Sequence, residues 1–328
     1  MCKNLRLLFL IVTTSMVSFS PIMAMLMPRE NTKTMCLDAT FFTPPFTLEK
    51  KKMRYDVSID KKVPYYYYLH DAADKKFVLK YPIEHLEYVI HDVLGSTIGA
   101  SIGININDVR IVLPHEPAIS AFDDEPSTIK TLHTRMPGSP VEASGAVSLK
   151  DGIVSLARLE SLCKHKDLTG IMGLDIFFNN VDRSKRNLFY NEQDGRYYGI
   201  DMDQIWPDLY LLPNTDAHDW DDEAKLLEQK NSVVNKSYQF LSTFFSDKTP
   251  TSEQSNALIG VNNTLNMLVQ KYSPAILYNL LMGLAKDVGY EYCQSKQKFV
   301  FAYIERNFNR VQKFQKLLTK LTNNSTST

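Results

Sequence analysis

Three oxygen-bearing side chains in the second half of the chain have the types and spacing for phosphate chemistry: Asp182, Asn187 and Asp201. Asn187 stands directly before a short apolar run at 188–190, and a polar turn separates this run from a second one at 197–200. The two runs predict a β-hairpin. Asp201 follows the second run, so the hairpin would bring the three side chains to one end of a rigid element. Such a set can hold a divalent cation against a triphosphate and orient an attacking hydroxyl.

This spacing is that of a kinase catalytic loop, in which an Asp-x-x-x-x-Asn step precedes a metal-binding Asp at the end of a short hairpin. The match extends to the flanking residues and comprises Leu174-Asp175, Asn180, Asp182-Arg183, Asn187, Ile200-Asp201 and Trp206-Pro207. With these residues the chain resembles the phosphatidylinositol 3-/4-kinase-like branch of the protein-kinase-like superfamily, especially type II phosphatidylinositol kinases and the related bacterial persistence-toxin kinases. An unrelated hairpin is the alternative, because Asp and Asn are common in turns.

The resemblance implies a role for each matched residue. Asp182 is expected to accept or orient the proton of the attacking hydroxyl, and Asn187 and Asp201 to bind Mg²⁺. Arg183 is the third predicted catalytic residue. It would either brace the loop or form an ion pair with Asp175, and the sequence leaves both roles open.

A lysine inside an apolar strand pattern adds to this set. Lys80 lies in the run 77–81, and a helical pattern that carries Glu84 and Glu87 follows it. A strand lysine followed by a helix glutamate is how a kinase fixes the lysine that neutralises the nucleotide phosphates. We therefore predict that Lys80 and Glu87 form an ion pair and bind the nucleotide, with Glu84 as the second choice of partner. A lysine on an edge strand that faces water is the alternative.

Three features depart from the kinase pattern. The chain has no glycine between Met25 and Leu94, so it lacks a Gly-rich loop upstream of the lysine. A turn near 70–75 is expected to cover the phosphates instead. Asp203 stands where these kinases have Gly after the metal-binding Asp, and Ser184 replaces the His that lipid kinases often show after Asp-Arg.

The order of patterns predicts an α+β, two-lobed protein-kinase-like fold. A small β-rich N-lobe is expected at 61–135 and a larger helical C-lobe at 136–320. The segment 131–138 would form the hinge between them, where its backbone would meet the adenine. Residues 25–60 are predicted to be a linker and lead-in, and residues 321–328 a flexible tail.

The start of the chain has the plan of a secretory signal peptide. Lys3 and Arg6 precede an apolar run at 7–19, and small or polar residues follow up to Ala24. We predict a signal peptide at 1–24 and export of the mature chain, to the periplasm or outside the cell, with delivery to a host as one destination. An uncleaved anchor is the alternative, but the run is short for a bilayer, so no stable membrane span is expected in the mature chain.

Composition narrows the classes of partner. Lys plus Arg and Asp plus Glu both number 37, so a nucleic-acid partner is not expected. The sequence therefore predicts a kinase that uses ATP and Mg²⁺, with a hydroxyl of a protein or a phosphoinositide as acceptor. Two alternatives remain: an exported pseudokinase-type binding protein, and a nucleotidyl transferase on the same fold.

Overall fold

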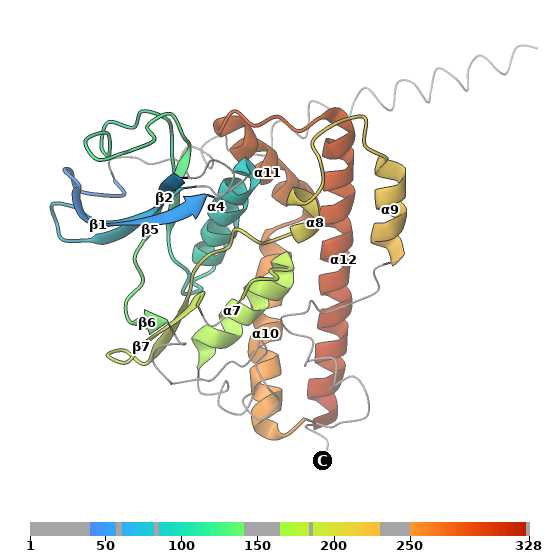
Figure 1. Ribbon diagram of the computed structural model, residues 1–328. Coiled ribbons are helices and arrows are strands. Elements are labelled where there is room, and N and C mark those ends of the chain that lie inside the picture. The colour runs from blue at the N-terminus through green and yellow to red at the C-terminus, as the bar shows by residue number, and fades with distance from the viewer. Residues whose placement is uncertain are drawn as a thin grey trace, which may run out of the picture. The chain divides into compact units, whose positions relative to one another are not determined.

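The computed structural model describes most of the chain beyond residue 39 (Figure 1). The expected signal peptide, Ser184 and Glu84 lie outside the described residues. No helix within the described part combines the length and apolar character needed to cross a membrane. The described ranges are 40–56, 61–81, 85–140, 165–183, 186–229 and 250–325.

The N-terminal part forms a five-stranded antiparallel sheet with strand order β1-β2-β3-β5-β4. β2 and β3 hold the aromatic and β-branched residues that favour strands, and β3 matches the predicted strand at 77–81 to within one residue at each end. The strands are β1 (Thr47–Asp56), β2 (Lys61–His70), β3 (Lys76–Lys80), β4 (Val109–Val112) and β5 (Lys130–Thr134).

The assignment of all of 25–60 to a linker is wrong for residues 47–56, which form β1. β1 is an edge strand that pairs only with β2 in the sheet order. Its lysines at 50–52 are exposed. Charged side chains protect an exposed edge from pairing with other chains. They also break the alternation of apolar and polar residues by which a strand is predicted, so β1 was missed.

A second, three-stranded sheet contains the predicted hairpin. β6 (Ser139–Pro140) pairs with β7 (Leu188–Asn191), and β7 pairs with β8 (Arg196–Gly199). The chain passes from the first sheet to the second through the segment predicted as the hinge. Gly138 has a φ of +86° there, and a Cβ at this position would collide with the backbone of Tyr190. The chain reversal at Gly138 therefore requires glycine.

The C-terminal part is helical, and α12 runs beside α10 (Figure 1). The predicted tail at 321–328 begins inside α12, which continues to Ser325, and Thr322 within this helix is buried. The helices are α4 (Leu86–Ser101), α7 (Lys166–Phe178), α8 (Pro207–Tyr210), α9 (Trp220–Gln229), α10 (Ser252–Lys271), α11 (Pro274–Asp287) and α12 (Gln294–Ser325).

Two apolar cores lie on either side of the first sheet. The smaller one gathers aromatic side chains such as Phe41 and Phe77 with the loop that contains Ile119. In the larger one, Ile90 and Leu94 of α4 join the side chains of the C-terminal helices. α4 thus lies between the sheet and the helices (Figure 1). The predicted fold class, α+β with an N-terminal sheet and a helical C-terminal part, is confirmed.

Candidate active site

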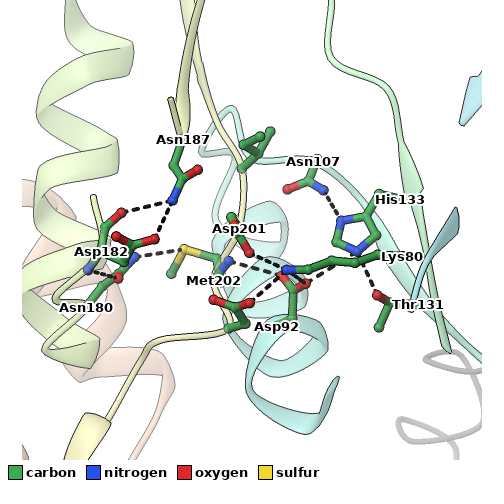
Figure 2. A network of polar contacts seen from close by, with 12 residues as sticks. Lys80, Asp92, Asn107, Thr131, His133, Asn180, Asp182, Asn187, Asp201 and Met202 are labelled. Carbon is green, nitrogen blue, oxygen red and sulfur yellow. Dashed lines mark hydrogen bonds and ion pairs between the residues drawn. The ribbon is translucent and has the colours of Figure 1, made fainter. Parts of the chain in front are cut away.

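The loop after α7 brings Asp182 and Asn187 together. α7 ends at Asn179, which has a left-handed backbone conformation, and the side-chain oxygen of Asn180 then accepts a hydrogen bond from the Asp182 amide at 3.0 Å. The Asn187 side-chain amide donates to the Asp182 carboxylate at 2.8 Å and to its carbonyl oxygen at 2.9 Å. Two residues that are five positions apart therefore form one rigid corner, as the spacing predicts (Figure 2).

Arg183 holds this loop in place through several hydrogen bonds. Its guanidinium forms a two-point ion pair with the buried Asp175, at 2.9 and 3.0 Å. It also donates to the backbone carbonyls of Asn187 and Ile200. Both roles that the sequence left open for Arg183 are therefore present. Because the side chain is only 6% exposed, Arg183 acts by positioning the loop and the hairpin.

Lys80 stands opposite, at the end of β3. Its Nζ lies 2.6 Å from an oxygen of Asp201, 2.7 Å from Asp203 and 3.8 Å from Asp92 (Figure 2). The alternative of a lysine facing water is wrong. We call Lys80, Asp92, Asp201 and Asp203 the lysine cluster. Three carboxylates share one ammonium group, so the lysine cluster carries an excess of negative charge.

Electrostatics within the lysine cluster follow from that imbalance. Burial alone would lower the pKa of Lys80, but the attraction of Asp201, Asp203 and Asp92 raises it well above its usual value. Burial opposes ionisation of Asp201, yet Lys80 holds the pKa of this carboxyl below its usual value. Burial, reinforced by repulsion from Asp201, outweighs the attraction of Lys80 at Asp203 and raises its pKa to about 8.

The electrostatics also join Asp182 to the lysine cluster. Burial and then the negative charge of Asp201 raise the pKa of Asp182, while the hydrogen bond from Asn187 lowers it. Figure 2 shows Asp182 and Asp201 in the same site. Burial makes Asp182 a better proton acceptor than an exposed aspartate.

The predicted ion pair between Lys80 and Glu87 is wrong. Glu87 lies in the first turn of α4 and pairs with Lys296 of α12 at 2.8 Å, and both side chains are buried. Asp92 is the α4 carboxylate that approaches Lys80. The two acids are about 140° apart around the helix, so they face different neighbours. The signal for Asp92 was present in the sequence: it is a lone carboxylate within the apolar run 89–94.

The turn that was expected to cover phosphates is at the wrong end of β3. Asp71 ties this turn together by accepting the backbone N–H groups of Thr43, Ala73 and Lys75. In the sheet register, Lys76 pairs with His70 next to this turn, whereas Lys80 pairs with Tyr66 at the opposite end of β3.

The oxygen donors of the site fit the predicted Mg²⁺. No three His, Cys, Asp or Glu side chains within the described residues are arranged to hold a metal ion by themselves. Mg²⁺ is commonly bound by one or two carboxylates together with substrate phosphates. Asp201, Asn187 and the excess negative charge suit that mode. One buried oxygen of Asp203 has no hydrogen-bond partner, which leaves a hard donor unsatisfied at this position.

Comparison with known proteins finds similarity only among solved structures. Neither a scan of protein families nor a search of curated proteins finds a match. Among solved structures, the chain is similar to the crystal structure of the Helicobacter pylori proinflammatory kinase CtkA, with 11% identity, a TM-score of 0.47, and coverage of 86% of this chain and 97% of that one. It is also similar to a Shewanella oneidensis toxin–antitoxin complex of HipA, HipB and operator DNA, with 13% identity, a TM-score of 0.42, and coverage of 88% and 70%.

The topology of the chain itself gives the fold class. A lysine on the third strand of a five-stranded antiparallel sheet, a helix directly after it, and an Asp-x-x-x-x-Asn loop before a hairpin are the elements of a protein-kinase-like fold.

Proposed function

We propose that the protein is a kinase that uses ATP and Mg²⁺ and transfers the γ-phosphoryl group to a hydroxyl of a protein or a lipid. The observation that carries this proposal is the meeting of two elements. Lys80 of the first sheet contacts Asp201 at the end of the hairpin, and the same hairpin holds Asn187 against Asp182. Kinase catalysis depends mainly on positioning and on neutralising charge, and this arrangement provides both.

Each side chain of the site has its own role in phosphoryl transfer. Lys80 exchanges part of its contact with Asp201 and Asp203 for phosphate oxygens of the nucleotide. Asn187 and Asp201 would hold Mg²⁺, which when bound would supply further neutralisation of phosphate charge. Asp182 orients the acceptor hydroxyl, whose oxygen bonds to the γ-phosphorus as the bond to the ADP oxygen breaks, and Asp182 takes the released proton. Arg183 keeps the loop and hairpin in register.

The acceptor and the destination belong to the proposal as well. The matched residues of the loop and hairpin support the phosphatidylinositol 3-/4-kinase-like branch, with a phosphoinositide or a protein as the acceptor. The basic and then apolar start at 1–24 supports export, with action in a host cell or in a lumen that contains ATP.

A transfer assay tests the proposal. The purified protein is incubated with Mg²⁺ and γ-labelled ATP, alone, with a protein pool, and with vesicles that contain phosphoinositides. Asp182→Asn should lower transfer by about 10²- to 10⁴-fold, because it removes the proton acceptor and keeps the shape. Asp74→Asn is the matched control, since Asp74 is exposed and its positive φ suits asparagine.

The assay also separates the proposal from its rivals. Equal transfer by the Asp182 and Asp74 variants would refute the assigned role of Asp182. Label that reaches the acceptor only from α-labelled ATP would identify a nucleotidyl transferase.

One observation favours the binding-protein alternative. Asp203 occupies the place of a glycine and binds Lys80, the cation that a nucleotide would need. Binding of Mg²⁺ and ATP without any transfer would assign the chain to that class.

A further inference from the structure

A chain of polar side chains reaches Asp92 from the first sheet. His133 of β5 is buried, and its Nδ1 lies 2.8 Å from the side-chain nitrogen of Asn107. Its Nε2 lies 2.8 Å from the Thr131 hydroxyl and 3.3 Å from the Asp92 carboxylate (Figure 2). The proposed function gives no role to His133 or Asn107, so their arrangement needs its own explanation.

The partners of His133 define its tautomer. The Asn107 side-chain nitrogen can only donate, so Nδ1 of His133 accepts and the ring proton is on Nε2. This proton points toward Thr131 and Asp92. Burial lowers the pKa of His133 and outweighs the attraction of Asp92, which agrees with a neutral ring. The Nε2–H of His133 therefore faces the Thr131 hydroxyl at 2.8 Å and the Asp92 carboxylate at 3.3 Å, and this contact helps to orient the carboxylate.

The backbone of Asn107 and the side chain of Asp92 contact the backbone on both sides of Asp201. Before Asp201, the backbone N–H of Asn107 donates to the Gly199 carbonyl at 3.1 Å, and the backbone N–H of Gly199 donates to the Asn105 carbonyl at 2.8 Å. The backbone packs closely here, because a Cβ at Gly199 would lie 2.7 Å from the Ile106 side chain. After it, the Met202 amide donates to Asp92 at 3.0 Å.

Asp201 needs such support. Its φ of +62° is in the left-handed region, which costs free energy for a residue other than glycine and persists only where the surroundings enforce it. The contacts of Asn107 and Asp92 hold the backbone on each side of this residue. His133 joins these two contacts into one network.

We propose that Asp92, His133 and Asn107 form a positioning clamp, here called the α4 clamp, that holds Asp201 and Lys80 in the geometry that binds Mg²⁺ and nucleotide. The proposal rests on the proposed function of the same site. His133 is its central positioning residue, and it acts through Asp92 without touching the nucleotide. The buried ion pair of Glu87 and Lys296 has a different role, because it joins α4 to α12.

Nucleotide affinity tests the α4 clamp. Titration calorimetry with Mg²⁺ and a non-hydrolysable ATP analogue is applied to the wild type, His133→Ala and His133→Gln. Alanine should weaken binding by about 10- to 100-fold, the range for losing a hydrogen bond to a charged group. Glutamine should stay within about threefold of the wild type, because its amide can donate from nearly the position of Nε2. His91→Gln, a buried histidine of α4 outside the clamp, is the matched control and should bind normally.

The outcomes are distinguishable from failure of the proposed function. Equal binding by wild type and His133→Ala, or equal losses in the alanine and glutamine variants, would overturn the clamp while the kinase proposal stands. If the wild type does not bind the analogue, the proposed function fails. The α4 clamp, which depends on nucleotide binding, then fails with it. The nitrogen chemical shifts of the His133 ring test the geometry separately: a proton on Nδ1 or a charged ring overturns the clamp even if the nucleotide binds.

Discussion

Two buried groups of charges flank α4, and they differ in their balance. Glu87 and Lys296 form a pair of one anion and one cation, with Lys296 also donating to the Leu212 carbonyl. On another face of the same helix, the lysine cluster sets one cation against three carboxylates. The first group is complete as it stands, whereas the second has negative charge to share with a further cation.

The comparison explains why the Glu87 prediction was wrong and shows how to tell structure from site. A buried charge is tolerated when its partner is at hand, so a balanced pair needs nothing else. An unbalanced cluster is costly in the free protein and becomes favourable when a cation arrives. Asp175 with Arg183 belongs to the balanced kind, which agrees with a positioning role.

The largest expected effect on stability follows from breaking the balanced pair of Glu87 and Lys296. Lys296→Met should lower the free energy of unfolding by about 3–5 kcal/mol, because it leaves Glu87 buried without its cation. Urea unfolding of the two proteins measures this difference.

Two further variants control the test of the balanced pair. Lys298→Met, at an exposed position of the same helix, should change stability by no more than about 0.5 kcal/mol. The double variant Glu87→Met with Lys296→Met should recover much of the loss, since a packed apolar pair avoids the desolvation cost. A Lys296→Met protein as stable as the wild type would contradict the assignment of this pair to structure.

An intermediate effect on stability is expected from His91, a buried histidine that packs against Trp206 and Tyr210. Burial lowers its pKa from 6.5 to about 3. Below pH 6.5 the unfolded chain takes up a proton and the folded chain does not, so this residue makes stability fall as the pH falls. The loss should approach about 1.4 kcal/mol per pH unit.

Unfolding of wild type and His91→Phe between pH 7.5 and 5 measures this loss. The phenylalanine variant should be less sensitive to acid over that window. Parallel curves for the two proteins would show that His91 takes up its proton in the folded state.

The smallest expected effect on stability comes from the unbalanced group. Asp203→Asn should change the free energy of unfolding by less than about 1 kcal/mol, because Lys80 keeps Asp201 and Asp92 as partners and no cation is left unpaired. The same variant should lower phosphoryl transfer, since the site loses one oxygen donor. A large loss of stability would place Asp203 with the structural pairs.

Much of the candidate site could be predicted from local sequence. The step from Asp182 to Asn187 closes on itself through a hydrogen bond, and a short hairpin sets where Asp201 falls, so spacing along the chain decides their geometry. A lysine in an apolar strand must find a partner inside the protein, which made Lys80 stand out.

The loop, the hairpin, the strand lysine and the α+β class could all be predicted before any coordinates, because each depends on contacts between residues close in the chain or on apolar periodicity. Three features required the folded chain: Asp92 and not Glu87 approaches Lys80, residues 47–56 form an edge strand, and His133 and Asn107 support Asp201. They required it because the rotation of a helix and the pairing of a polar edge depend on partners distant in the sequence. Lys296, which captures Glu87, lies 209 positions away from it.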